Sequence, residues 1–198
     1  LGLLSDGGVH SHQNHIHAVL ELAKQQGCKQ VYFHVITDGR DTPPNSAGEF
    51  VELLEAKINE LQIGRIVSVV GRFYAMDRDN RWERVSKAYH LISTGKSERQ
   101  ADSTISAIQM AYEAGETDEF IAPTTVGKSA MINEGDAVIF MNYRADRARE
   151  ITQALTSSTF QAFERESFKA TNFICLTEYK KDFNLECAYP PITVVNTL

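Results

Sequence analysis

Apolar runs and amphipathic stretches alternate along the chain, and this alternation predicts its main elements. The runs are dense in aliphatic and aromatic side chains, so we interpret each of them as a buried strand. The predicted strands are 1–4, 31–36, 65–70, 137–141 and 172–176. Apolar residues recur at helical spacing in the segments between them. The predicted helices are 12–26, 46–61, 82–93, 103–114 and a last one that ends near 155.

The order of these elements predicts the fold class. Strands that alternate with helices favour an α/β fold, a three-layer sandwich in which helices flank a mainly parallel sheet. The stretch 120–126 is interpreted as extended, with Pro123 marking an edge or a loop. Residues 193–195 form a last apolar segment near the end of the sequence. The 198 residues contain no repeat, low-complexity tract or obvious linker, so one domain over 1–198 is the economical interpretation.

The sharpest change of polarity follows the predicted strand 31–36. The turn 38–44 places Arg40 and Asp41 side by side, after a glycine and before two prolines that stiffen the exit. A helix follows whose first residues, 46–49, have the spacing of a capping box. An adjacent arginine and aspartate can bind an anion and handle a proton beside it. The simpler interpretation is an exposed turn whose two charges face water.

Similar polar turns follow other predicted strands. The residues of interest in these turns are His10, Arg40, Asp41, Arg72, Arg78, Arg144 and Arg147. Because the carboxyl ends of parallel strands meet at one edge of a sheet, we expect these side chains to converge. Guanidinium groups bind phosphate and carboxylate through paired hydrogen bonds. The sequence therefore predicts a site for a small anion of two or three charges that carries both groups.

Several arginines also have a simpler structural interpretation. Arg72 could cap the carboxyl end of a neighbouring helix, and Arg147 could pair with a flanking acidic residue on its own helix. Arg81 and Arg84 are interpreted as part of a solvated helix face. A shared anion site explains the recurrence of arginine after several strands more simply than a separate coincidence at each of them.

The histidines His10, His12, His15 and His17 raise a second possibility, a metal site. The last three fall on a predicted helix where they do not share one face, and no second cluster of ligands follows downstream. We therefore assign His10 a role as hydrogen-bond donor or proton carrier at the glycine turn. His34 lies within a predicted strand and is interpreted as a packed core residue.

Composition narrows the functional classes. The formal net charge of −6 argues against a general binder of nucleic acid or acidic membranes, and no apolar run has the length of a membrane span. The three cysteines lie far apart, as expected of reduced thiols in a cytoplasmic protein. The signatures of P-loops, dinucleotide sites and the G-x-S-x-G elbow are absent from the sequence. It predicts no nucleotide site of these kinds and no such serine nucleophile.

Five motifs in the chain resemble those of the cofactor-independent phosphoglycerate mutase family. They are Ser5–His12 (SDGGVHSH), Asp38–Pro44 (DGRDTPP), Gly71–Arg78 (GRFYAMDR), Thr117–Phe120 (TDEF) and Asn142–Arg147 (NYRADR). Their order and their spread along the chain make the resemblance specific. Ala145 replaces a proline often found in the last motif, a departure that leaves both arginines of that motif in place.

The resemblance implies an isomerase of glycolysis that interconverts 3-phosphoglycerate and 2-phosphoglycerate without a bisphosphoglycerate primer. Enzymes of this family have two domains. A phosphatase-like domain holds two Mn²⁺ or Mg²⁺ ions and a transiently phosphorylated serine, and a phosphotransferase domain is inserted into it. Residues 1–198 resemble the inserted domain alone, excised from the larger enzyme close to both hinges. No cofactor is expected within this chain, and the phosphatase-like metal domain is absent from it.

The resemblance also assigns roles to residues. It implies that the seven residues of the predicted anion site bind substrate: His10, Arg40, Asp41, Arg72, Arg78, Arg144 and Arg147. It assigns proton transfer with the glycerate hydroxyls to Asp41. It implies a small-molecule partner without nucleic acid or membrane, a monomeric cytoplasmic full-length enzyme, and an inactive isolated domain. Two different functions stay open: a non-catalytic module that binds a small phosphorylated carboxylic acid, and a metal-dependent hydrolase built on the histidines 10–17.

Overall fold

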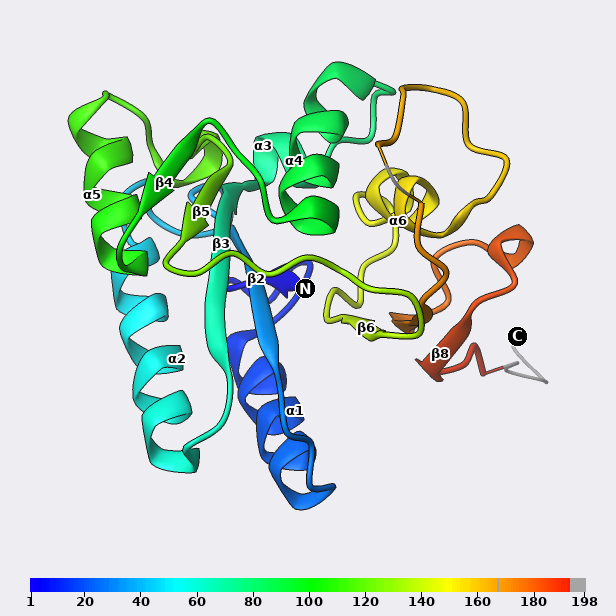
Figure 1. Ribbon diagram of the computed structural model, residues 1–198, viewed down its shortest axis with the longest axis horizontal. Helices are drawn as coiled ribbons and strands as arrows, with labels where there is room; N and C mark the ends of the chain where they lie inside the picture. The colour runs from blue at the N-terminus through cyan, green and yellow to red at the C-terminus, as the bar shows by residue number, and fades with distance from the viewer. Residues whose placement is uncertain (167, 193–198) are drawn as a thin grey trace, which may run out of the picture.

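The computed structural model describes residues 1–166 and 168–192 (Figure 1), so the last apolar segment, 193–195, lies outside the described residues. Its α-helices are α1 Gln13–Gln25, α2 Ala47–Leu61, α3 Arg72–Ala75, α4 Trp82–Thr94, α5 Thr104–Glu113 and α6 Arg149–Thr156, with 3₁₀ turns η1 Asp118–Phe120 and η2 Lys181–Phe183. The strands are β1 Gly2–Leu3, β2 Tyr32–Thr37, β3 Arg65–Gly71, β4 Arg99–Ala101, β5 Thr124–Val126, β6 Ala137–Phe140, β7 Asn172–Thr177 and β8 Glu186–Tyr189. None of the described helices is long and apolar enough to cross a membrane.

The strands form two sheets. The larger has the order β1-β2-β3-β5-β4 and the smaller has the order β6-β7-β8. Among the described pairs only β3 and β5 run antiparallel, so the predicted mainly parallel α/β fold is confirmed. The sequence analysis missed β4 and β8 because both strands are short and mostly exposed, which leaves no apolar run. Pro123 lies in the loop before β5, which is an interior strand.

The two sheets meet where β1 lies beside β6. The amide of Met141 donates a hydrogen bond of 2.8 Å to the carbonyl of Leu1, and the amide of Leu3 donates one of 3.0 Å to Asn142 Oδ1. Alternate residues of both sheets point into the same two cores: Leu3 and Phe140 into one, Leu4 and Met141 into the other. The turn after β6 therefore lies at the same edge as the turns after β1, β2 and β3.

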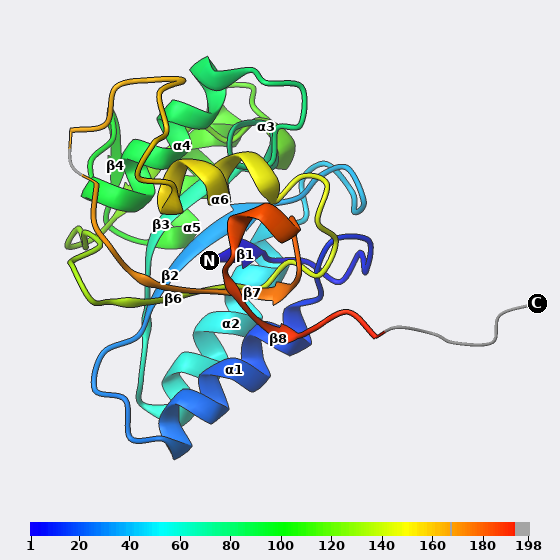
Figure 2. The same cartoon turned by 90° about the vertical axis from the view of Figure 1, so that its right-hand side faces the viewer.

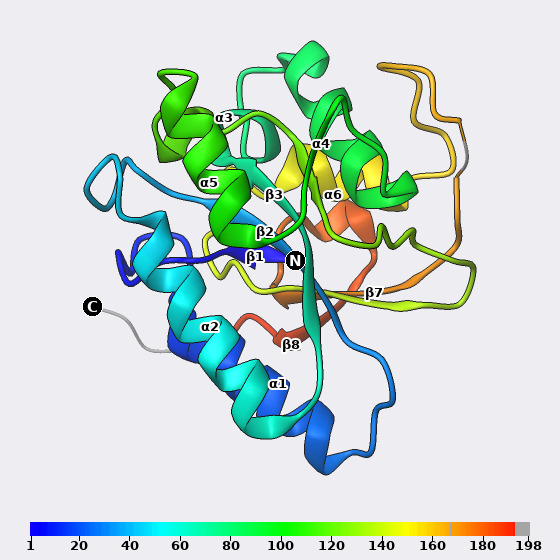
Figure 3. The ribbon, with the colours of Figure 1, turned by 60° about the vertical axis from the view of Figure 1, so that its left-hand side comes forward.

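Helices cover both faces of this joined sheet. Apolar residues of α1, α2 and α5 fill one core, and those of α3, α4 and α6 fill the other. Figure 2 shows the strands between α1 and α2 on one side and α4 and α6 on the other, and Figure 3 shows α1, α2 and α5 along a common face. This is the three-layer arrangement that the sequence predicts.

The start of α2 differs from its prediction in one respect. Ser46 is the N-cap and the helix begins at Ala47, but the capping box does not form, because the Ser46 hydroxyl donates to the carbonyl of Pro43 instead. The carboxylate of Asp118 caps the helix in its place, accepting hydrogen bonds of 2.8 Å from the amides of Ser46 and Ala47. An acidic group at this end also complements the helix dipole. Residues far apart in sequence thus fix the entry to α2.

Candidate active site

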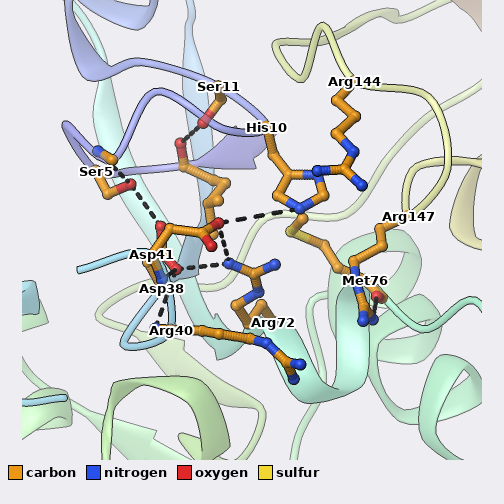
Figure 4. A network of polar contacts seen from close by, with 12 residues as sticks. Ser5, His10, Ser11, Asp38, Arg40, Asp41, Arg72, Met76, Arg144 and Arg147 are labelled. Atoms are coloured by element: carbon orange, nitrogen blue, oxygen red, sulfur yellow. Dashed lines mark hydrogen bonds and ion pairs between the residues drawn. The ribbon is translucent and has the colours of Figure 1, made fainter. Parts of the chain in front are cut away.

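The predicted site residues gather at one edge of the joined sheet, and Figure 4 labels all of them except Arg78. His10 follows β1, Arg40 and Asp41 follow β2, and Arg72 is the first residue after β3. Arg78 lies beyond α3, and Arg144 and Arg147 lie between β6 and α6. Electrostatic coupling links Arg147 to Arg40, Arg72 and Arg78, and links His10 to Arg72 and Arg144. The structure therefore brings all seven residues into one neighbourhood.

Three charged side chains form a buried network at the centre of this edge. Nη1 of Arg72 lies 2.7 Å from Asp38 Oδ1 and 2.6 Å from Asp41 Oδ2. The exposed fractions of these side chains are 3% for Arg72, 1% for Asp38 and 18% for Asp41. Burial opposes ionisation of Asp38, but hydrogen bonds from the Asp41 amide, Ser5 and Arg72 outweigh it and lower the pKa of Asp38. The network holds fixed charges in a fixed geometry.

The turn that carries Arg40 and Asp41 is held from two sides. Oδ1 of Asp38 accepts hydrogen bonds from the amides of Arg40, at 3.2 Å, and Asp41, at 3.0 Å. Gly39 has a φ of +70°, and a Cβ there would lie 2.7 Å from the Cβ of Asp118. Only glycine fits this turn without displacing the residue that caps α2. Asp38 and Asp118 are thus parts of the site that the sequence analysis did not select, although both lie in the motifs it quoted.

His10 lies between two carboxylates but is neutral at neutral pH. Its Nε2 is 4.0 Å from Asp41 Oδ2, and its Nδ1 is 3.7 Å from Asp146 Oδ1. Burial, followed by the nearby Arg72, lowers the pKa of His10 to about 4 although Asp146 and Asp41 oppose the shift. His10 is 2% exposed, and its Nδ1 has no hydrogen-bond partner in the described part of the chain. A neutral ring in this position can donate to or accept from a ligand.

Three arginines at the rim are held by exposed ion pairs. Asp146 binds both Arg78, at 3.0 Å, and Arg144, at 2.9 Å, and Glu119 binds Arg40 at 3.3 Å. The arginine side chains are 47%, 48% and 56% exposed, respectively. Such pairs are screened by water and contribute only about 0–1 kcal/mol each. An incoming phosphate or carboxylate can therefore replace Asp146 and Glu119 at little cost.

Arg147 lies just before α6 and does not form the predicted ion pair with a flanking acidic residue on its own helix. Its Nη1 donates a hydrogen bond of 3.0 Å to the carbonyl of Met76. Burial and then Arg78, Arg72 and Arg40 lower the pKa of Arg147, since each nearby positive charge disfavours another. The guanidinium groups thus concentrate positive potential in a chain whose formal net charge is −6.

Contacts decide between the interpretations of the remaining arginines and histidines. Arg72 binds carboxylates rather than a helix end. Arg84 packs over Phe73, with its Cζ 3.9 Å from the ring centre, and is only partly solvated, whereas Arg81 is exposed as predicted.

His12 accepts a hydrogen bond from the amide of Asn14 and caps α1. Among residues 1–166 and 168–192 no group of three or more His, Cys, Asp or Glu side chains could hold a metal ion, so the histidine metal site gains no support.

Comparisons with known proteins point to one family. The model of the BPG-independent PGAM N-terminus matches residues 1–181. The chain is 55% identical to the 2,3-bisphosphoglycerate-independent phosphoglycerate mutase of Vesicomyosocius okutanii over 198 residues, which is 100% of this chain and 39% of that protein. It is 51% identical to the protein of the same name from Aeromonas salmonicida, again over 198 residues, 100% of this chain and 39% of the relative.

A solved structure agrees with these matches. A phosphoglycerate mutase of Leishmania mexicana, crystallised at low cobalt concentration, has a TM-score of 0.93 and 32% sequence identity to this chain. The alignment covers 98% of this chain and 38% of that one. The chain thus spans about two fifths of the length of the relatives it matches.

Proposed function

The chain belongs to the BPG-independent phosphoglycerate mutase family, and from this premise we propose that it is the substrate-holding part of an enzyme that interconverts 3-phosphoglycerate and 2-phosphoglycerate. The observation that carries the proposal is the gathering of five arginines, His10 and Asp41 at one sheet edge. A phosphoglycerate carries a phosphate, a carboxylate and one free hydroxyl. The site offers groups suited to each of them.

The exposed arginines are proposed to bind the two anionic groups. Arg40, Arg78 and Arg144 exchange their surface carboxylate partners for the phosphate and carboxylate of the substrate. Arg147, whose guanidinium already has a backbone partner, adds positive potential beside them. Planar guanidinium groups suit both anions, because each can be bound through two parallel hydrogen bonds.

Asp41 is proposed to exchange protons with the glycerate hydroxyls. Arg72 and the turn held by Asp38 fix its carboxyl group, and the neutral ring of His10 lies 4.0 Å away. A carboxyl group held in this position can give a proton to the oxygen that loses the phosphoryl group, and can then take up the proton of the other hydroxyl as its oxygen attacks that group. Reorientation of a glycerate that stays bound would let the phosphoryl group return to the other hydroxyl.

The remaining chemistry is proposed to belong to the rest of the enzyme. On the family resemblance, that part holds a serine that carries the phosphoryl group between the two hydroxyls, together with two Mn²⁺ or Mg²⁺ ions. The described residues of this chain include no cluster suited to such an ion, so no step of the mechanism proposed for this chain involves a metal. We expect the whole enzyme to be monomeric and to act on the small-molecule substrate alone.

The division of labour can be tested by comparing the 198-residue chain with the whole enzyme. Formation of 2-phosphoglycerate from 3-phosphoglycerate is followed in a coupled assay, with and without Mn²⁺. We expect activity in the whole enzyme and none in the chain alone, either as mutase or as phosphatase. An isolated chain that interconverts the two substrates would refute the division of labour. A whole enzyme that binds phosphoglycerate without converting it would favour the non-catalytic module instead.

A further inference from the structure

Two buried carboxyl groups outside the anion site face each other between the segment that precedes α4 and the first turn of α6. Asp77 is 4% exposed and Glu150 is 8% exposed. Oδ2 of Asp77 accepts hydrogen bonds from the amides of Asp79, at 2.9 Å, and Arg81, at 2.8 Å. Oε1 of Glu150 accepts one of 2.9 Å from the amide of Asn80. The two carboxyl groups lie within hydrogen-bonding range of each other.

A hydrogen bond between two carboxyl groups requires a proton on one of them. Oε2 of Glu150 is buried and receives no hydrogen bond from the described residues, which leaves it free to carry that proton. Asp77 has more groups that stabilise a negative charge, since it accepts from two amides and its Oδ1 lies 3.5 Å from Nη1 of Arg84. The proton therefore belongs on Glu150, which donates to an ionised Asp77.

The charges around the pair agree with this assignment. The groups that face Glu150 are Asp77 and Asp79 from the segment before α4, and Arg84 of α4 reaches the pair through Asp77. Burial raises the pKa of Glu150 to about 7, with Asp77 and Asp79 adding to the shift and the Asn80 amide opposing it. Asp77 is also buried, but hydrogen bonds from the amides of Arg81 and Asp79 outweigh burial and lower its pKa.

The pair lies in a row of contacts that joins two parts of the anion site. Three consecutive residues of one segment each contact the segment 146–150. The carbonyl of Met76 accepts from Arg147, Asp77 faces Glu150, and Arg78 pairs with Asp146. This row sets the spacing between Arg78 and Arg147. Of its three contacts, the carboxyl pair is the one that a proton exchanging near neutral pH can break.

We propose that the protonated pair of Glu150 and Asp77 positions Arg78 and Arg147 for the substrate, and that loss of its proton separates the two segments and weakens substrate binding. The proposal rests on the proposed function for its effect on activity. When Glu150 ionises, two buried carboxylates repel each other and Oε2 is left without a donor. Glu150 is thus a positioning residue, since it acts on the site through the arginines and does not itself touch the substrate.

Glu150→Gln imitates the protonated acid at every pH. Its amide oxygen can accept from Asn80 and its amide nitrogen can donate to Asp77. Glu83→Gln, on the exposed face of α4, is the matched control. We measure KM and kcat for 3-phosphoglycerate with the whole enzyme from pH 6 to 8.5. We expect KM to rise several-fold with pH in the wild type and in Glu83→Gln, while kcat changes less. In Glu150→Gln we expect KM to stay nearly constant over this pH range. The same rise in Glu150→Gln as in the wild type would overturn the proposal.

A second measurement tests the pair without any assay of activity. The pKa of Glu150 is about 7 in the folded protein against an ordinary value of 4.5. The stabilisation linked to this proton is therefore complete below the ordinary value and is lost as the pH rises to about 7. We expect the melting temperature of Glu150→Gln, relative to the wild type, to increase between pH 5 and 8. A difference that does not change with pH would contradict the shared proton.

The kinetic measurement and the melting measurement together distinguish failure of the carboxyl-pair proposal from failure of the proposed function. If the melting temperatures follow the expected course but no variant interconverts the phosphoglycerates, the proposed function fails and the carboxyl pair stands. If Glu150→Gln does not fold, Asp77→Asn replaces it. The new amide can donate to an ionised Glu150, and removal of the acidic neighbour lowers the pKa of Glu150, so KM should again lose its rise with pH. A wild-type rise in Asp77→Asn would overturn the proposal.

Discussion

The anion site has a buried half and an exposed half, and they are built differently. In the buried half Arg72 joins Asp38 and Asp41 through ion pairs of 2.7 and 2.6 Å, out of contact with most solvent. In the exposed half, Arg40, Arg78 and Arg144 are about half exposed, and each forms an ion pair with a carboxylate at the rim of the site. The contrast suggests rigid placement for the proposed proton transfer and adaptable placement for the proposed anion binding.

Position directly at the end of a strand accounts for the burial of Asp38 and Arg72, although not for that of Asp41, which lies beyond the exposed Arg40 on the same turn. Asp38 and Arg72 are the first residues after β2 and β3, so the neighbouring strands and helices enclose them. Arg78 and Arg144 come several residues later, after the chain has left the sheet. A buried ion pair costs desolvation and is strongly destabilised by loss of one partner, whereas an exposed pair is nearly neutral. The predictions below test this contrast.

The largest effect should come from removing the shared arginine of the buried half. Arg72→Met leaves Asp38 and Asp41 without their common partner, which should lower the free energy of unfolding by about 3–5 kcal/mol. Arg78→Met is the matched change in the exposed half and should cost less than about 1 kcal/mol. Urea denaturation of both variants measures the difference. Equal losses would show that the two halves do not differ in the way described.

Asp41→Asn should lower catalysis more than stability, because Arg72 keeps Asp38 as an ion-pair partner. The amide keeps the size of the side chain but cannot take up a proton, so kcat should fall by roughly 10²- to 10⁴-fold. Glu119→Gln, which changes the partly buried carboxylate that pairs with Arg40, is the control and should retain most of kcat. Steady-state kinetics and a melting curve of each variant separate the two effects. Wild-type turnover in Asp41→Asn would end the acid–base assignment.

His10 should make the buried half sensitive to acid. Its pKa is about 4 when folded against an ordinary 6.5, so below 6.5 the unfolded chain binds a proton that the folded chain excludes. The stability of the wild type, relative to His10→Asn, should therefore fall by up to about 1.4 kcal/mol per pH unit as the pH drops from 6.5 towards 5. A flat difference for His10→Asn would contradict a buried neutral imidazole.

The smallest effects on stability should come from the exposed arginines. Arg40→Lys and Arg144→Lys keep the charge but lose the planar paired contact, so KM should rise roughly tenfold while stability changes by less than about 1 kcal/mol. Arg81→Lys, outside the site, should leave both quantities close to the wild type. If the two site variants behave like the wild type, the arginines contribute only a diffuse positive field, and raised salt should then abolish binding.

Much of this arrangement could be predicted from sequence because it follows from local pattern. The apolar run 31–36 and its charged turn identified the strand, the turn and the position of Arg40 and Asp41. What could not be predicted depends on partners distant in the chain. Asp118 replaces the expected capping box of α2 from 72 and 71 positions away, through the amides of Ser46 and Ala47. No local spacing reveals such a contact, nor the junction of the two sheets.

The placement of the exposed arginines against the ligand is the central claim, and NMR of arginine Nε–Hε groups tests it most directly. The 198-residue chain is titrated with 3-phosphoglycerate while these signals are followed. We predict that the signals of Arg40, Arg78 and Arg144 shift together with one binding constant, because these residues exchange surface carboxylates for the ligand. The signal of Arg65, which donates to the carbonyl of Lys128 away from the site, should stay in place. The account would be contradicted if the signals of the three site arginines did not shift, or if the signal of Arg65 shifted as much as theirs.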